Sequence, residues 1–190
     1  MRESQSAESE LSLIKRAGEG DRDAFQQLYS IYEKRLYAYL MRMLDCKEDA
    51  EDLLVETMLA VWQGAGAFRG RSKLSTWIFG IAHNKAMTRL ASKTQRPITN
   101  LDQAMDLEAT GPGPDSRQIE SETREQVQAA LQQLSEEHRA VIDLTFYHGL
   151  SYAEIAQVVK CPVNTIKTRM FYARQRLKQL LSGAKSEGAF

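Results

Sequence analysis

The sequence predicts an all-α protein made of two small helical domains joined by a flexible linker. Apolar residues recur at three- and four-residue steps through most of the chain, as they do along one face of a helix. The stretch 94–117 lacks this period and holds three of the four prolines, which is typical of a linker. The two-residue alternation of a half-buried strand is found nowhere. We therefore expect domains over 1–93 and 118–190, the second containing a helix-turn-helix.

Composition sets limits on the class of protein. With 43% hydrophobic residues, 190 residues are enough for two cores. Lys+Arg and Asp+Glu both number 25, so the distribution of charge must indicate the partners. Cys46 and Cys161 are too far apart for a disulfide framework or a metal motif. The polar N-terminus and the lack of a ~20-residue apolar run predict a cytoplasmic protein without membrane insertion.

Three helices are expected in the first domain, where the apolar positions run over 25–44, 50–62 and 74–90. Asp21 is a plausible N-cap for the first helix, and Asp45 with Glu48 resembles a capping box for the second. The glycine-rich stretch 64–70 predicts a loop before the third.

Capping signals divide the second domain into short helices. After a helix over 122–134, Ser135 caps the next one, and Gly149 ends it. The segment Ser151–Glu154 forms a capping box for a third helix, and Pro162 stands at the start of a longer, basic fourth. A short capped helix, a turn and a longer helix make a helix-turn-helix.

The last helix has two distinct sides at ~100° per residue. The buried side has an apolar stripe of Ile166, Met170, Ala173, Leu177 and Leu180. The opposite side carries Asn164, Lys167, Thr168, Phe171, Tyr172, Gln175 and Lys178, flanked by Arg169, Arg174 and Arg176. An ordinary helical hairpin with solvated charges has the same topology. However, 155–186 lack any acidic residue, and exposed aromatic residues with flanking cations suit the bases and phosphates of a DNA major groove.

Three stretches, in order and with matching spacing, resemble the small RNA polymerase sigma factors of the extracytoplasmic-function (ECF) group. They are "DAEDLLVETMLAVWQ", "FRGRSKLSTWIFGIAHNKAMTRL" and "GLSYAEIAQVVKCPVNTIKTRMFYARQRL". The resemblance implies a specificity subunit that carries out no catalysis itself. It would bind core polymerase, recognise the −35 and −10 promoter elements, and promote melting.

The first stretch corresponds to the polymerase-binding helix. Asp49, Asp52 and Glu56 share one helix face with Leu53 between them, and the resemblance implies docking on the clamp helices of the largest subunit. An acidic, solvent-facing side of an amphipathic helix is the alternative interpretation. Val55 stands where the family commonly has Gln.

The second stretch corresponds to the −10 reader. The resemblance implies that a loop captures an unstacked base, which offsets the free energy of flipping it. The loop residues are Phe68, Arg69, Gly70, Arg71 and Lys73, and Asn84 and Lys85 on the following helix contact the same strand. Trp77 is either a core residue or a stacking platform. The family often has Arg where this chain has Gly80 and His83, and His83 could be a satisfied surface residue.

The third stretch corresponds to the −35 reader, and the matching positions are Lys167, Thr168, Phe171 and Tyr172, with Arg169, Arg174 and Arg176 beside them. Lys160 and Asn164 stand where Gly is frequent. The resemblance also implies contact with the polymerase flap and an anti-sigma partner. The linker carries four carboxylates that are expected to hinder its permanent binding in the RNA channel of polymerase: Asp102, Asp106, Glu108 and Asp115.

Two other classes of protein fit less well. A response regulator would begin with an α/β receiver domain, and the first half of this chain has no strand pattern. An enzyme is disfavoured because His83, His138 and His148 are scattered, and no phosphate loop or nucleophile–base set is present. We therefore expect neither a cofactor nor a metal.

Overall fold

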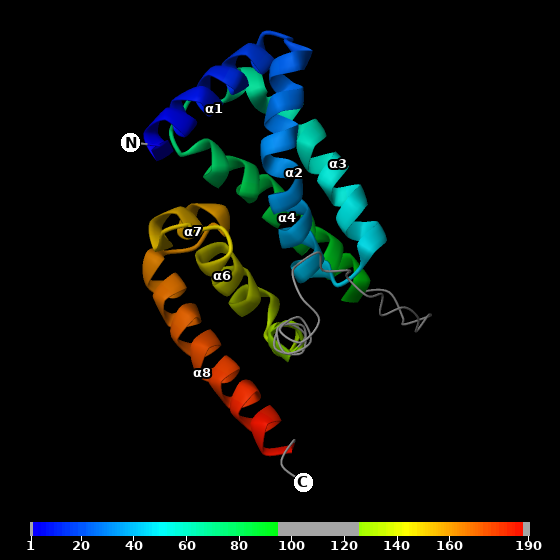
Figure 1. Ribbon diagram of the computed structural model, residues 1–190, viewed down its shortest axis with the longest axis vertical. Helices are drawn as coiled ribbons and strands as arrows, with labels where there is room; N and C mark the ends of the chain where they lie inside the picture. The colour runs from blue at the N-terminus through cyan, green and yellow to red at the C-terminus, as the bar shows by residue number, and fades with distance from the viewer. Residues whose placement is uncertain (1, 95–125, 188–190) are drawn as a thin grey trace, which may run out of the picture.

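The computed structural model describes residues 2–94 and 126–187, and every regular element in these ranges is helical. The first domain comprises α1 (Arg2–Gly18), α2 (Arg22–Leu44), α3 (Lys47–Gly64), a 3-10 turn (Ala65–Ala67) and α4 (Leu74–Thr94). The second comprises a helical stretch at 126–132, α6 (Glu136–Phe146), α7 (Tyr152–Val158) and α8 (Val163–Glu187) (Figure 1). The predicted all-α, two-domain fold is confirmed. The linker carboxylates lie outside the described residues.

Several helix ends follow the sequence signals. The Asp21 carboxylate accepts a hydrogen bond from the Ala24 amide and caps α2. The Ser151–Glu154 capping box of α7 is present in full. Ser135 caps α6, and Gly149 adopts φ +67° in the turn that follows this helix. Local side-chain chemistry therefore fixes these boundaries.

Two sequence expectations need correction. Asp45 does not cap α3: it takes a left-handed conformation (φ 49°) and closes α2, so Cys46 becomes the N-cap of α3 without a side-chain hydrogen bond. Because the Asp45 backbone ends one helix, its side chain is not placed to begin the next. In addition, α1 was not expected, although Leu13, Ile14 and Ala17 bury one of its faces against the domain.

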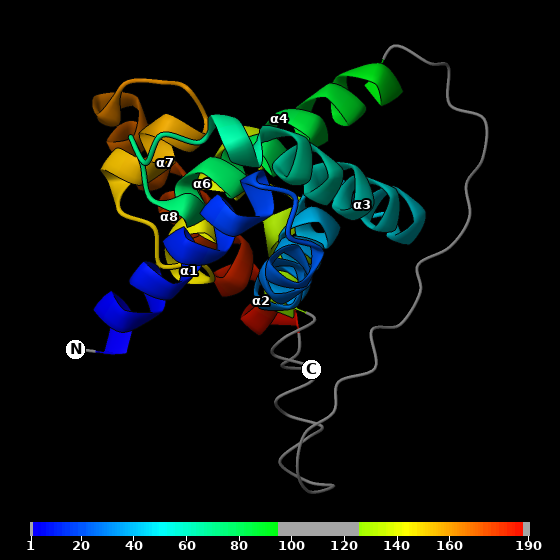
Figure 2. The ribbon, with the colours of Figure 1, turned by 90° about the horizontal axis from the view of Figure 1, so that it is seen from above.

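The two domains pack directly against each other. Helix α7 lies beside α4, and α6 approaches the end of α2 (Figures 1 and 2). The core continues across this boundary, from Phe79 of α4 to Val158 of α7. In the described parts of the chain, no helix has the length and apolar character needed to cross a membrane.

Candidate nucleic-acid interface

Helix α8 presents the face expected from its sequence. Ile166, Met170 and Ala173 are buried, which turns Lys167, Thr168 and the neighbouring aromatic residues to solvent. Phe171 is 63% exposed and Tyr172 53%, and their rings meet edge to face at 5.4 Å. Large exposed aromatic side chains are uncommon on a merely solvated helix, so this face is suited to a ligand.

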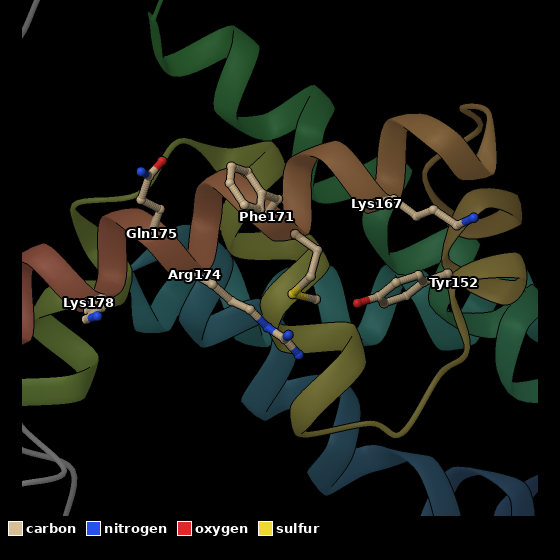
Figure 3. A pocket seen from close by; sticks show the side chains of 7 residues that line it. Tyr152, Lys167, Phe171, Arg174, Gln175 and Lys178 are labelled. Carbon is tan, nitrogen blue, oxygen red and sulfur yellow. The ribbon is translucent and has the colours of Figure 1, made fainter.

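A groove of about 390 Å³ follows this face between α7 and α8 (Figure 3). Its lining is mainly apolar with a cationic rim, and consists of Tyr152, Lys167, Met170, Phe171, Arg174, Gln175 and Lys178. The Arg174 guanidinium stacks over the Phe146 ring at 5.4 Å. Tyr152 was not among the predicted site residues. Its position directly after the N-cap Ser151 was the sequence signal that could have placed it in the site.

The turn of the helix-turn-helix is made by Lys160, which adopts φ +53°, where a glycine is the usual residue. Asn164 lies within α8, where its carbonyl accepts a hydrogen bond from the Thr168 hydroxyl at 3.1 Å. The flanking arginines differ: Arg176 is exposed, whereas Arg169 is half-buried. The predicted −35 residues therefore come together on one surface, with Arg169 at its inner edge.

The loop before α4 is organised around an aromatic pair. Phe68 and Trp77 lie 5.0 Å apart, and a Cβ added at Gly64 would lie 3.0 Å from the Trp77 ring. Trp77 is thus partly buried and also forms one wall of the loop. Gly70 adopts φ +65°, and the Arg69 guanidinium donates to the Gly66 carbonyl at 3.0 Å. Arg71 and Lys73 are exposed.

A second glycine contact fixes the base of this loop. A Cβ added at Gly18, the last residue of α1, would lie 2.7 Å from the Gly66 backbone nitrogen. No side chain fits at that separation. The close approach of two backbones therefore holds the loop against α1.

The acidic face of α3 lies against the basic face of α4. Lys85 pairs with Glu56 at 2.8 Å, while Arg89 and Lys93 both pair with Asp49. The paired ammonium of Lys85 lowers the pKa of Glu56, and Lys93 and Arg89 lower that of Asp49 in spite of its partial burial. Asp49 and Glu56, which were predicted to contact polymerase, and Lys85, which was predicted to contact the −10 element, therefore lie in one group of ion pairs.

The other residues of these two sets are placed differently. Asp52 is exposed, but Leu53 is only 2% exposed and belongs to the core. Asn84 is exposed on α4. Leu53 therefore holds α3 in place through the domain core, whereas the side chains of Asp52 and Asn84 are accessible to partners.

An apolar groove of about 370 Å³ adjoins the exposed side of α3. Phe25 and Trp62, whose ring centroids lie 5.0 Å apart, form part of it. Val55, 61% exposed, and Leu59, 53% exposed, continue the apolar surface. This groove was not predicted from the sequence. Its signal is that Val55 and Leu59 are apolar, lie four positions apart and stand outside the buried stripe of α3.

His83 is buried, in contrast to the surface position considered above. It is 7% exposed, and its Nδ1 lies 2.8 Å from the Tyr39 hydroxyl. Burial, aided by the positive charges of Arg169 and Lys160, lowers the pKa of His83 to about 4. Burial also raises the pKa of Tyr39, so we assign a protonated hydroxyl that donates to a neutral imidazole. Among the described residues no cluster of three His, Cys, Asp or Glu could hold a metal.

The site therefore combines a helix-turn-helix reading face with a helical domain that carries a basic loop and an apolar groove, and this defines a class of two-domain DNA-binding proteins. The family models for sigma-70 region 2 and sigma-70 region 4 match residues 28–96 and 124–177. The RNA polymerase sigma-H factor of Pseudomonas aeruginosa is 30% identical over 182 residues, covering 92% of this chain and 94% of that protein. The ECF sigma factor SigW of Bacillus subtilis is 30% identical over 88% of this chain and 94% of its own.

Two solved structures share the fold. CnrH, in complex with the cytosolic domain of CnrY, has a TM-score of 0.69 at 24% identity and covers 92% of this chain and 98% of its own. RpoE from Bartonella quintana, in complex with the anti-sigma factor NepR, has a TM-score of 0.69 at 25% identity, with 83% and 96% covered. The chain belongs to the ECF group of the sigma-70 family, as the sequence resemblance implied. It is a non-catalytic subunit that directs RNA polymerase to promoters through regions 2 and 4.

Proposed function

We propose that this sigma factor divides promoter recognition between two surfaces. Region 4, within 118–190, reads the −35 element through Lys167, Thr168, Phe171 and Tyr172, with arginines on the phosphates. Region 2, within 1–93, captures the −10 element with the loop 68–73 and with Asn84 and Lys85. The observation that carries this proposal is the exposed aromatic and cationic face of α8. A helix fits the major groove, and Lys and Arg are suited to its base edges and phosphates.

The −35 and −10 assignments are tested by transcription from a promoter library randomised at both elements, with purified core polymerase. Lys167→Ala should change the base preference only at the upstream element, by ~1–3 kcal/mol at the contacted position. Asn84→Ala should change it only at the downstream element. Equal shifts at both elements in either variant would contradict the division.

For polymerase docking, we propose that the surface of α3 extends from Asp52 over Val55 and Leu59 into the apolar groove. An apolar groove with a charged border provides both desolvated contact area and orientation. Leu59→Glu should weaken binding to core polymerase at least ~10-fold, because a carboxylate would be placed in the apolar contact. Lys47→Ala, on the same helix but in an exposed ion pair, is the matched control. Equal affinities of the two variants would refute this surface.

Regulation is also proposed. We propose that an anti-sigma factor binds this chain and covers part of the same groove; RpoE of Bartonella quintana, which shares the fold, was solved in complex with the anti-sigma factor NepR. We place the protein in the cytoplasm, with core polymerase, its flap and clamp helices, and promoter DNA as partners.

A further inference from the structure

One arginine of the DNA-reading helix is held by an aromatic ring and not by a carboxylate. The Arg174 guanidinium lies over the ring of Phe146, 5.4 Å from its centroid. Figure 3 shows the Arg174 side chain leaving α8 in the direction of α6, the helix that ends at Phe146. In the described parts of the chain no carboxylate pairs with Arg174, whereas Arg42 pairs with Asp143. A ring restrains a guanidinium without neutralising it, so Arg174 keeps its full charge for a ligand.

Phe146 stands at a helix end that is closed by hydrogen bonds. It is 59% exposed, although Leu144 in the same turn is fully buried. The Leu150 amide donates to the Leu144 carbonyl at 3.0 Å, and Gly149 at φ +67° turns the chain between them. The backbone under Phe146 is therefore fixed. Its ring contributes little to the core and is available as a platform for a cation.

Arg174 is fixed in the same way at the base of its side chain. Ala173, the residue before it, is fully buried, and Met170 one turn earlier is 2% exposed. These contacts set the rotation of α8 and place Arg174 in the lining of the groove, on the same side as Phe171. Arg174 is itself exposed, and its N–H groups make no hydrogen bond to any other described residue. Its donors are therefore all available to a ligand.

A guanidinium held in this way is well prepared for a phosphate. Arginine has a long flexible side chain, and fixing it on a ligand costs conformational entropy. A ring that already restrains the side chain lowers this cost, because fewer rotamers remain to be lost on binding. The ring occupies one face of the planar group, whereas the N–H donors lie in the plane. A phosphate can therefore accept two parallel hydrogen bonds at the edge while the stack persists.

We propose that Phe146 is a positioning residue for promoter binding, which holds the Arg174 guanidinium at the edge of the groove, ready for a phosphate beside the −35 element. Phe146 acts through Arg174 and does not itself contact DNA. The identity of the ligand rests on the proposed function, but the ordering of Arg174 by the ring does not. A cation–π contact at an exposed site corresponds to a change of ~2- to 5-fold in affinity.

The end of α6 offers a matched set of variants. Phe146→Leu removes the ring and keeps an apolar side chain that favours a helix. Phe146→Tyr keeps the ring and is the conservative variant. Tyr147→Leu is the control, because Tyr147 is the adjacent aromatic residue, 52% exposed, and its ring lies under Arg42 and not under Arg174. Circular dichroism checks that each variant keeps its helix content.

The ordering of Arg174 is measured on the free full chain by nitrogen NMR relaxation of its Nε–H group. This group should be restrained on the picosecond-to-nanosecond timescale in the parent and in Phe146→Tyr, and more mobile in Phe146→Leu. Tyr147→Leu should leave its mobility unchanged. Equal mobility in the parent and in Phe146→Leu overturns the positioning role.

Promoter binding is measured with the holoenzyme over a series of salt concentrations. The probe is a fluorescent duplex that carries the upstream element and ends before the downstream one. Phe146→Leu should weaken binding ~2- to 5-fold and leave the salt dependence unchanged, since the phosphate contact still forms. Arg174→Ala should reduce the slope of log K against log salt by ~0.9, because one phosphate contact is lost. In the Arg174→Ala background, Phe146→Leu should have no further effect.

These measurements separate a positioning residue from a merely structural one. If Phe146→Leu weakens binding as much in the Arg174→Ala background as in the parent, Phe146 does not act through Arg174 and the proposal is overturned. An unchanged salt slope in Arg174→Ala overturns it as well, since no phosphate contact is then made. If the parent holoenzyme does not bind the duplex, the proposed function fails, and the NMR relaxation still decides whether Phe146 orders Arg174.

Discussion

Arg139 gives the most demanding test of how the second domain is held together. Its guanidinium donates five hydrogen bonds to main-chain carbonyls, two of them at the end of α2 and three to Leu131, Gln132 and Leu134 around the preceding helix end. Arg139→Met keeps much of the aliphatic volume and removes every donor. The carbonyls that lose their only partner are then buried without a hydrogen bond.

The magnitude follows from these contacts. Hydrogen bonds to a charged group contribute ~1.5–3 kcal/mol each, but five bonds from one side chain are not additive. Each carbonyl left buried without a partner costs ~1–3 kcal/mol, so we expect a total loss of ~3–5 kcal/mol once non-additivity is allowed for. For a chain of this length, 1 kcal/mol corresponds to ~2–4 °C in Tm, so the melting temperature should fall by about 10 °C. The Tm of Arg139→Lys should lie between those of the parent and Arg139→Met, because the ammonium group of lysine cannot reproduce the planar arrangement of donors in a guanidinium group.

The assay is thermal unfolding followed by circular dichroism at 222 nm, with urea unfolding as a check. The control is Lys47→Ala, which breaks an exposed pair with Glu51 at 3.9 Å and should change stability by no more than ~0.5 kcal/mol. If Arg139→Met lowers Tm no more than Lys47→Ala, the carbonyls are satisfied in another way and the reasoning is wrong.

Three further predictions follow from the geometry. Gly18→Ala should destabilise the protein by ~1–3 kcal/mol in urea unfolding, because its Cβ would overlap the Gly66 backbone, and an unchanged midpoint would contradict that contact. The pKa of His83 is about 4 in the folded chain and about 6.5 in the unfolded chain, so the unfolded chain binds more protons between these values and the free energy of unfolding falls as the pH drops. Between pH 7 and pH 5, the free energy of unfolding of His83→Gln should therefore fall by ~2 kcal/mol less than that of the parent. Equal losses in the two proteins would refute this. Phe171→Ala should reduce selectivity at the upstream element, whereas Arg174→Ala should weaken DNA binding across sequences, as measured by competition binding of the holoenzyme; identical promoter rankings would oppose the distinction.

Features set by neighbours along the chain could be predicted from sequence. Asp21 and the Ser151–Glu154 box cap their helices because the side chain and the amides it satisfies lie within three residues. The buried stripe of α8 follows from helical periodicity. The prediction that Asp45 caps α3 was wrong by one residue. Asp45 lies in a short connection between two helices, and the sequence did not indicate whether it would end the first helix or begin the second.

Features set by tertiary contact could not be predicted. Asp143 lies 101 residues from Arg42 in the chain, and neither residue stands in a motif that suggests the pair. Asp49 and Glu56 were expected on a face open to polymerase, but α4 supplies cations to both. Helix α1 went unnoticed because Leu13, Ile14 and Ala17, which are buried in the part of this helix whose side chains are described, form too short an apolar set to predict a helix by themselves.

Run-off transcription by purified core polymerase tests the central claim most directly. The template carries promoters mapped as transcription starts after overexpression of this protein. Transcripts from those starts should appear only when the protein is added. They should be lost with Leu59→Glu, which removes polymerase docking, and retained with Lys47→Ala. Equal transcription with and without the protein would show that it is not the specificity subunit described here.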